Sequence, residues 1–262
     1  MTEFEAILLG LLQGATEFLP VSSSGHLVMG QELLGVSLPG VSFEVAVHVA
    51  TLLSVVLVYR GRLLELARGT LVERDRDSWR YVGLLAVATL PVAVVGLTLG
   101  DRVEALFDTP WTVGVALLVT GGFLFTTRWA LLRSGEPRFG FGTAVLIGLA
   151  QCLALVPGIS RSGATVTAAL WLGVSPLEAA AFSFLLSIPA IAGAAVLQAP
   201  ELAGAVGDVG AVPLVLGFGV AGLTGILAIH LFIRMLRSRA FPAFALYCWG
   251  VGLLFLGWLA LG

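Results

Sequence analysis

Lysine is absent from this chain of 262 residues, and charged residues of any kind are scarce, at 11% of the sequence. The net charge is −2, hydrophobic residues make up 58% of the chain, and the mean hydropathy is +1.01. A soluble domain of this length is ordinarily far more polar. The composition therefore indicates an integral membrane protein.

Cysteine is nearly absent as well. Cys152 and Cys248 lie in apolar stretches, without the close spacing or histidine companions of a metal or redox site. We expect both to be small core residues. The basic region of a signal peptide is also missing, because Glu3 and Glu5 precede the first apolar stretch, so we expect the N-terminal segment to persist in the mature protein.

Apolar runs of about 20 residues, the length that crosses a bilayer, occur at six places in the chain. They lie near residues 41–59, 80–99, 110–128, 177–197, 211–232 and 241–260. The sequence thus predicts an all-α polytopic membrane protein with six transmembrane helices.

All 14 basic residues are arginines, and most of them gather in three connections between these runs. The three groups are Arg60, Arg62, Arg68, Arg74, Arg76 and Arg80; Arg128, Arg133 and Arg138; and Arg234, Arg237 and Arg239. By the positive-inside rule these connections face the cytoplasm. The connections 100–109 and 198–210, with Asp101, Arg102, Glu104, Asp108, Glu201 and Asp208, are expected outside. Nucleic-acid binding is disfavoured, because no single basic face remains beside the membrane.

Two polar stretches interrupt the apolar chain and are related in sequence. They read QGATEFLPVSSSGH at Gln13–His26 and QCLALVPGISRSGAT at Gln151–Thr165. A shift of 151 − 13 = 138 positions aligns them without a gap and matches Gly10, Leu11, Gln13, Ser22, Ser24 and Gly25 with Gly148, Leu149, Gln151, Ser160, Ser162 and Gly163. We interpret residues 1–262 as one membrane domain made of two repeats, about 1–138 and 139–262.

The segments around these motifs, roughly 3–36 and 143–172, contain too much Pro, Ser and Gly to cross as ordinary helices. We expect each to form a re-entrant hairpin of helix, polar turn and returning helix, which lipid tolerates only where the turn is buried in protein or lines a watery cavity. Since three spans separate them, the hairpins would enter from opposite sides. This is an inverted-topology repeat, in which the polar tips meet near the midplane.

The two copies differ in the residues that carry charge or reactivity. They are Glu17, Ser23 and His26 in the first copy, against Leu155, Arg161 and Ala164 in the second. A charge inside a bilayer costs about 2.5–3.5 kcal/mol on insertion scales. Glu17 and Arg161 either neutralise one another as a buried pair that docks the two halves or belong to a functional site, which is favoured because intramembrane ionisable residues usually mark one.

Hydroxyl groups and helix-start N–H groups accompany the guanidinium, which is the composition of a phosphate pocket. The candidate phosphate-binding residues are Ser22, Ser24, Ser160, Arg161, Ser162 and Thr165. Phosphoester cleavage needs a cation, a nucleophile and a group that moves a proton. Arg161 supplies the cation, and Ser23 or a water molecule the nucleophile. His26 or Glu17 moves the proton.

A divalent cation, Mg²⁺ or Ca²⁺, is a further interpretation of Glu17, because Gln13 lies one helical turn earlier. One carboxylate and one amide make a poor cage. Any metal would therefore share the phosphates of the substrate, and no permanently bound cofactor is expected.

Other polar residues near the spans have structural explanations. Glu178 follows Ser175 in a Ser-x-x-Glu capping box at a span start. Glu44 occupies a similar start, as a cap or a second acid, and the cap is favoured. His48, one turn further on, is a candidate for contact with the pocket, whereas His230 lies near a basic end; neither has metal-ligand spacing.

The two motifs, together with SPLEAAAFSFLLSIPA at 175–190, resemble the undecaprenyl pyrophosphate phosphatases of the bacitracin-resistance type over nearly the whole chain. On this resemblance Glu17 matches the family's essential glutamate, with Gln13 as an accepted variant four residues earlier. Ser23 and His26 match its catalytic hydroxyl and histidine. Arg161 matches its phosphate-binding arginine, with Ser160 and Thr165 as companions.

The resemblance implies a multi-pass enzyme of the plasma membrane that hydrolyses a C55 polyprenyl pyrophosphate to the monophosphate and inorganic phosphate on the outer side. It would recycle the lipid carrier for cell-envelope synthesis and confer bacitracin resistance. Its partners would be that lipid and the surrounding membrane lipids, and no nucleic acid. Assembly into a homodimer is a further alternative. The alternative is a transporter or flippase of polyprenyl phosphate, which would use Arg161 but would not need Ser23 or His26. A structural scaffold would leave the buried Glu17, His26 and Arg161 without a role.

Overall fold

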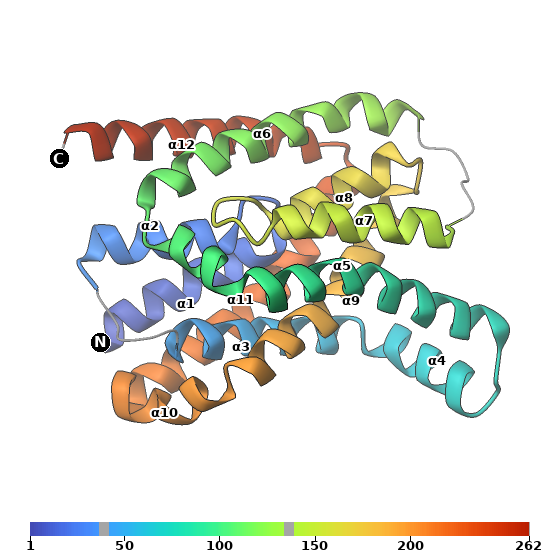
Figure 1. Ribbon diagram of the computed structural model, residues 1–262, viewed down its shortest axis with the longest axis horizontal. Helices are drawn as coiled ribbons and strands as arrows, with labels where there is room; N and C mark the ends of the chain where they lie inside the picture. The colour runs from blue at the N-terminus through green and yellow to red at the C-terminus, as the bar shows by residue number, and fades with distance from the viewer. Residues whose placement is uncertain (37–41, 134–138, 262) are drawn as a thin grey trace.

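The structure, a computed structural model, describes residues 1–36, 42–133 and 139–261 (Figure 1). Every regular element in these ranges is a helix. In chain order they are α1 (Glu3–Phe18), α2 (Ser23–Leu34), α3 (Ser42–Val58), α4 (Arg60–Leu71), α5 (Arg76–Phe107), α6 (Pro110–Arg133), α7 (Phe141–Leu153), α8 (Arg161–Trp171), α9 (Pro176–Leu197), α10 (Ala199–Val209), α11 (Ala211–Arg237), the 3₁₀ turn η1 (Phe241–Ala243) and α12 (Phe244–Leu261). The all-α prediction is confirmed for these residues.

Five helical segments are long and apolar enough to cross a membrane: α5, α6, α9, α11 and the continuous η1–α12 segment. A sixth candidate is the pair α3 and α4, whose axes differ by 73°. Each of the six predicted apolar runs falls on one of these candidates. Five or six possible spans are therefore present in the described part of the chain.

Three of the connections predicted between apolar runs contain helix. Helix α4 lies within 60–80, α5 continues to Phe107 after a break at Leu99 (φ −123°, ψ 16°), and α10 fills most of 198–210. These helical stretches were not predicted, because a long apolar run reveals a span but not a short or mixed helix. Arg138, from the second group of arginines, lies outside the described residues.

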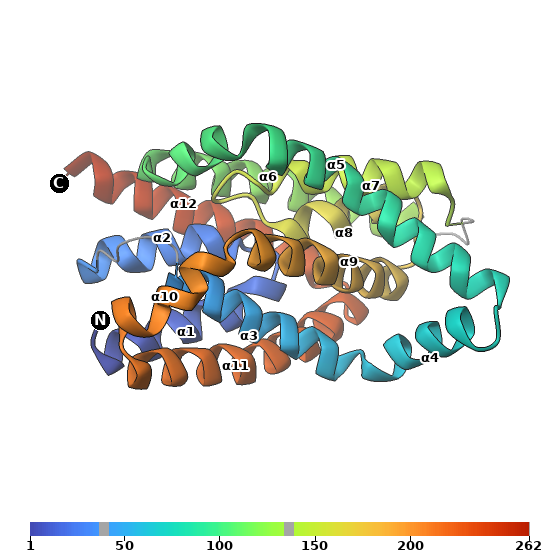
Figure 2. The ribbon, with the colours of Figure 1, turned by 60° about the horizontal axis from the view of Figure 1, so that its bottom comes forward.

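Two helical hairpins, α1–α2 and α7–α8, occupy opposite parts of the molecule (Figures 1 and 2). The α1–α2 hairpin lies toward the end that holds both chain termini, and the α7–α8 hairpin lies toward the end that holds the turn between α4 and α5. Their connecting turns meet between these ends, where Ser162 Oγ donates to the carbonyl of Leu19 at 3.2 Å. The arrangement brings the two polar motifs into contact.

Each hairpin's first helix packs closely against a long helix through a glycine. A Cβ atom on Gly10 of α1 would collide with the backbone of Gly217 on α11, and one on Gly148 of α7 with the backbone of Ala88 on α5. The repeat alignment pairs these two glycines. Close backbone approach therefore holds α1 and α7 in place and fixes where each polar turn begins.

An aromatic cluster supports the end of α1, next to the first motif. Phe18 meets Phe184 edge-on with ring centroids 5.6 Å apart, and Phe184 in turn meets Phe232 at 5.0 Å. All three side chains are completely or almost completely buried. Such pairs add about 0.5–1.5 kcal/mol each beyond area burial, so the backbone at Glu17 is held by α9 and α11.

The minor structural predictions have mixed outcomes. Cys248 is buried as expected, but Cys152 is only half-buried. The capping box at α9 is wrong: Ser175 is the N-cap, yet its exposed side chain makes no capping hydrogen bond. Glu178 instead lines a cavity of about 290 Å³ near the α4–α5 turn. Glu44 does lie in the first turn of α3, where its carboxylate accepts a hydrogen bond from Gln31 of α2.

Candidate active site

Both returning helices start with the same serine cap. Ser22 is the N-cap of α2 and Ser160 the N-cap of α8, and each Oγ accepts from the backbone N–H three residues later, at 3.3 and 3.0 Å. Each capping Oγ also lies 3.2 Å from the hydroxyl of Ser24 or Ser162, two residues on. The first N–H groups of a helix have no partner inside the helix. The two copies of the motif thus present two positively polarised helix starts.

The turns of the two hairpins are tied together by these serines. Gly158 N donates to Ser22 Oγ at 3.1 Å, and Thr120 of α6 donates to the carbonyl of Gly158 at 2.8 Å. Ser22 has φ 69°. This left-handed conformation is unfavourable in free energy for any residue that carries a side chain. Contacts from three segments therefore hold the α2 start in a conformation that serine alone would rarely adopt.

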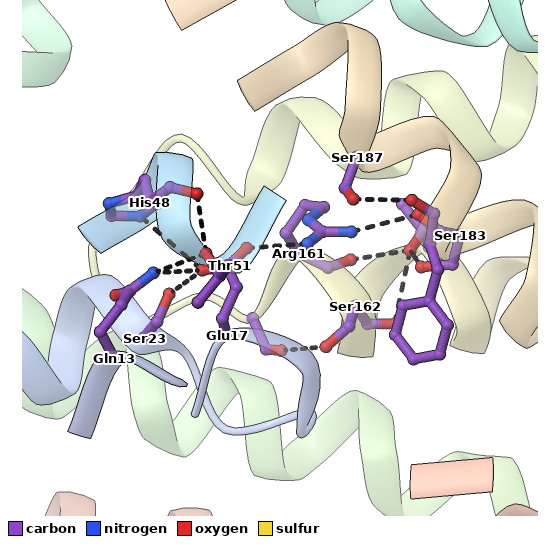
Figure 3. Close-up of polar contacts among 12 residues, drawn as sticks. Gln13, Glu17, Ser23, His48, Thr51, Arg161, Ser162, Ser183 and Ser187 are labelled. Carbon is purple, nitrogen blue, oxygen red and sulfur yellow. Dashed lines mark hydrogen bonds and ion pairs between the residues drawn. The ribbon is translucent and has the colours of Figure 1, made fainter. Parts of the chain in front are cut away.

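Glu17, near the end of α1, is the centre of the polar cluster (Figure 3). Its Oε2 atom accepts from Ser23 Oγ at 2.5 Å and from Gln13 Nε2 at 3.1 Å, and its Oε1 atom accepts from Arg161 Nη2 at 2.8 Å. Glu17 is 7% exposed. The structure thus brings three other predicted site residues, from both hairpins, to the buried carboxylate of Glu17.

Arg161 reaches Glu17 from the first residue of α8, and a second contact fixes its guanidinium. Nη1 donates to the carbonyl of Ser183 on α9 at 3.1 Å, and the hydroxyls of Ser183 and Thr165 are 2.7 Å apart. A buried ion pair is costly to break, by about 3–5 kcal/mol, because one charge is left uncompensated. The pair with Glu17 therefore joins the two hairpins, as the structural interpretation of these charges required.

His48 of α3 faces the same carboxylate. Its Nε2 atom lies 3.7 Å from Glu17 Oε2, while its Nδ1 atom lies 2.7 Å from the carbonyl of Glu44. A carbonyl only accepts, so Nδ1 carries a proton and Nε2 is the nitrogen that faces the carboxylate. With a side chain 30% exposed, His48 connects the buried Glu17 to the exterior. The sequence suggested His48 as a candidate for contact with the pocket, and the structure shows this contact with Glu17.

His26 lies elsewhere. Its Nδ1 atom bonds to the carbonyl of Ser22 at 2.8 Å and its Nε2 atom to Tyr247 Oη of α12 at 2.9 Å. In the described part of the chain no hydrogen bond or ion pair joins His26 to Glu17 or Arg161. The imidazole is therefore next to the start of α2, but on the side that faces α12.

Three neighbours of the site were missed in the sequence. Thr51 accepts from Gln13 Nε2 at 3.5 Å, Ser183 binds Arg161, and Tyr247 binds His26. Thr51 had a local signal, because it follows His48 by three residues and so shares its helix face. The other two come from α9 and α12, and no spacing in the chain relates them to the motifs.

The fit of a metal ion is limited by the available ligands. Among the described residues, no group of three or more His, Cys, Asp and Glu side chains is placed to hold one. Gln13 Oε1, however, is a buried acceptor without a hydrogen-bond partner in those residues, and it belongs to the side chain that touches Glu17. One amide oxygen and one carboxylate fit a cation only when a bound phosphate supplies further oxygen ligands.

The long apolar helices are those of a multi-pass membrane protein, and buried charges and hydroxyls gather inside it where two helix starts meet, as a candidate site for an anion. Residues 6–254 match the family model described as bacitracin resistance protein BacA, and the chain belongs to that family.

Curated relatives carry the name undecaprenyl-diphosphatase. The relative from Desulforapulum autotrophicum is 43% identical over 270 residues, which cover 97% of each chain. The one from Rubrobacter xylanophilus is 45% identical over 255 residues, 93% of each chain, and the one from Desulfatibacillum aliphaticivorans is 39% identical over 265 residues, 95% of each.

Proposed function

We propose that this protein is an undecaprenyl-diphosphatase that splits its lipid substrate at the joint between the two hairpins. Similarity to enzymes of that name over nearly the whole chain supports the activity. The observation that carries the site is one buried carboxylate, Glu17, bonded at once to a hydroxyl nucleophile, Ser23, and to a guanidinium, Arg161. A carrier that only moves a phosphate group has no use for the hydroxyl.

The fold that we propose around this site is an inverted repeat of residues about 1–138 and 139–262. Six spans result when α3 and α4 count as one bent span, and the hairpins α1–α2 and α7–α8 are re-entrant. Three features support it: the matching serine caps, the matching glycine contacts of α1 and α7, and the opposite positions of the hairpins.

Binding of the diphosphate would use the positive charge of Arg161, which is paired with Glu17 in the structure. The guanidinium of Arg161 is planar and matches two phosphate oxygens at once. The helix starts capped by Ser22 and Ser160 add N–H donors, while Ser24, Ser162 and Thr165 hold the turns and the α8–α9 contact in shape. The terminal phosphate takes over from Glu17 as the partner of Arg161, which frees the carboxylate to accept a proton.

The chemical step follows from the short contact between Ser23 and Glu17. Ser23 Oγ, or a water molecule in its place, attacks the terminal phosphorus and passes its proton to Glu17. The bond from that phosphorus to the bridging oxygen breaks, and undecaprenyl phosphate leaves. On the serine route, water then cleaves the phosphoserine and releases inorganic phosphate. His26, at the start of α2, serves as the second proton carrier.

A divalent cation is proposed only as a companion of the substrate. Gln13 Oε1 and Glu17 would hold it from the protein side, and the diphosphate would supply the other oxygens. When bound, such an ion neutralises charge on the phosphates.

We further propose that the protein lies in the plasma membrane with its arginine-rich ends toward the cytoplasm. The site would then open to the outside, where the α1–α2 hairpin enters. The polyprenyl tail would run along the apolar outer surfaces of the helices, among membrane lipids.

The activity is tested with purified protein in detergent and undecaprenyl diphosphate as substrate. Wild type should release phosphate, and Ser23→Ala and Arg161→Ala should lower kcat at least about 100-fold, as loss of a nucleophile or of a charge stabiliser does. Ser238→Ala, at the exposed end of α11, is the matched control and should keep full activity. Trapping of a phosphoserine separates attack by Ser23 from attack by water. Wild type that releases no phosphate, but moves undecaprenyl phosphate across vesicles, would establish the carrier instead.

A further inference from the structure

The hydrogen bonds of His26 fix which of its nitrogens is basic. Nδ1 lies 2.8 Å from the carbonyl oxygen of Ser22, which can only accept, so Nδ1 carries a proton. In the neutral ring Nε2 is then the acceptor. The hydroxyl of Tyr247, 2.9 Å away, is the donor that meets it. The only nitrogen of His26 that can take up a proton therefore points at Tyr247.

The two rings also stack. Their centroids are 5.7 Å apart and their planes differ by 10°. His26 is 6% exposed, whereas Tyr247 is 45% exposed. Tyr247 belongs to α12, far from both motifs in the sequence, and it lies between the basic nitrogen of a buried imidazole and the exterior of the protein.

A tyrosine hydroxyl suits this position because it can donate and accept. It donates to Nε2 while His26 is neutral, and after rotation about the C–O bond it accepts from Nε2–H when His26 is protonated. Phenylalanine would keep the stack but leave a buried ring nitrogen without a partner in both states, which costs free energy.

We propose that Tyr247 is a positioning residue for His26: it holds the imidazole in one orientation and one tautomer, and it supports Nε2 in both protonation states. This rests on the proposed function, in which His26 carries a proton. Tyr247 itself touches neither the Glu17 carboxylate nor the guanidinium of Arg161 through any hydrogen bond in the described residues. Its effect on catalysis passes through the histidine.

The first test compares Tyr247→Phe with Tyr59→Phe. Tyr59 is a matched control, since its ring packs on Phe184 and it has no contact with His26. We expect Tyr247→Phe to lower kcat about tenfold, the effect of one lost hydrogen bond to a group that becomes charged, with KM unchanged. Tyr59→Phe should keep the wild-type kcat. A wild-type kcat in Tyr247→Phe would overturn the proposal.

A double-mutant cycle separates positioning from general structural damage. In a His26→Gln background, Tyr247→Phe should cause no further loss of kcat, because the residue through which it acts is gone. A further tenfold loss there would show that Tyr247 acts independently of His26 and would also overturn the proposal. Failure of the proposed function would look different: His26→Gln would then retain full activity, or wild type would show none.

Nitrogen-15 NMR of labelled histidine gives a readout that does not depend on activity. The chain has three histidines, and His26→Gln identifies the missing signal. In wild type, we expect the neutral His26 ring with its proton on Nδ1. Tyr247→Phe should shift the Nε2 resonance or introduce the second tautomer, whereas an unchanged His26 spectrum would contradict a positioning role.

Discussion

Glu17 is the residue on which the two hairpins depend most. One carboxylate joins α1, α2 and α8, and it balances the charge of Arg161 in surroundings where neither side chain is well exposed. In the proposed function, the same bonds that dock the hairpins also prepare Ser23 and Arg161 for phosphate chemistry. The structural and the functional explanations of this ion pair are therefore complementary.

Replacing Glu17 with glutamine should damage stability as well as activity. The amide keeps the shape of the side chain but leaves the guanidinium of Arg161 without a countercharge. We expect the free energy of unfolding to fall by about 3–5 kcal/mol, the range for breaking a buried ion pair, together with loss of phosphate release. Denaturant unfolding in detergent measures the first. The matched control is Glu104→Gln at an exposed position near the end of α5, and equal stability of the two variants would show that the pair does not hold the hairpins.

Arg161→Lys keeps the positive charge and tests the geometry of the fork. Arg161 contacts Glu17 with one nitrogen and the Ser183 carbonyl with the other. A lysine ammonium is a single point and cannot make both contacts in the plane of a phosphate. We expect kcat to fall about 10²–10³-fold, as for loss of one preorganised donor, while stability falls less than in Glu17→Gln. A lysine variant with wild-type kcat would mean that charge alone suffices.

Helix α5 begins with a cap that should make its first turn sensitive to pH. Asp75 accepts from the backbone N–H of Ser78 at 2.9 Å, from its hydroxyl at 2.8 Å and from Asp77 N at 3.3 Å. These hydrogen bonds, chiefly the backbone bond from Ser78, hold the pKa of Asp75 below its ordinary value. A lowered folded-state pKa means that the cap contributes fully above the unfolded pKa of about 3.9 and is lost as the pH falls through the folded value.

Asp75→Ala should therefore speed hydrogen exchange in the first turn of α5 at neutral pH. The difference from wild type should shrink as the pH falls from about 4 through the lowered folded-state pKa, where the wild-type carboxyl becomes protonated. Asp75→Asn is the control, because asparagine caps a helix nearly as well and does not titrate. A difference between Asp75→Ala and wild type that stays constant down to low pH would exclude a role for the carboxylate charge.

The close contact between α1 and α11 should depend on the absence of a side chain at Gly10. A Cβ atom at Gly10 would meet the carbonyl and Cα of Gly217, and backbone atoms cannot rotate away. We expect Gly10→Ala to lower the free energy of unfolding by about 1–3 kcal/mol, the range for overpacking, and to reduce activity by displacing Glu17. In Gly219→Ala, where the new methyl group meets open space, stability should be unchanged or improved. Thermal melting in detergent measures the stability of both variants. Equal melting temperatures for Gly10→Ala and Gly219→Ala would refute the close-contact argument.

Individual elements differ in how well the sequence alone predicts them. The long apolar helices were predictable, because a bilayer demands about 20 apolar residues in a row. The two serine caps were also predictable from their repeated Ser-x-Ser-Gly pattern. Helices α4 and α10 were not, since a short helix with charged or small residues lacks a distinctive run. Ser175 makes no capping hydrogen bond, which shows that a capping pattern permits this bond but does not ensure it when the serine is exposed.

Across the whole molecule, the duplication predicted the central contact of the site. Glu17 and Arg161 are 144 residues apart, and only the repeat suggested that they meet. Partners outside the repeat motifs could not be found in this way. Ser183 and Tyr247 reach the site because α9 and α12 pack beside the hairpins, and such packing depends on the shape of the complete bundle.

Labelling of single cysteines tests the orientation of the molecule in the membrane. The parent for these variants carries Cys152→Ala and Cys248→Ala, which remove the two native thiols. Arg74→Cys, in the α4–α5 turn, lies in an arginine-rich segment that the positive-inside rule assigns to the cytoplasm. Asp101→Cys lies beyond the Leu99 break in α5, at the opposite end of that long helix. With a membrane-impermeant maleimide on intact cells, we expect the cysteine at position 101 to react and the one at position 74 to react only after permeabilisation. The reverse pattern would turn the α1–α2 hairpin toward the cytoplasm, and the proposed site would then open on the wrong side for a lipid diphosphate outside the cell.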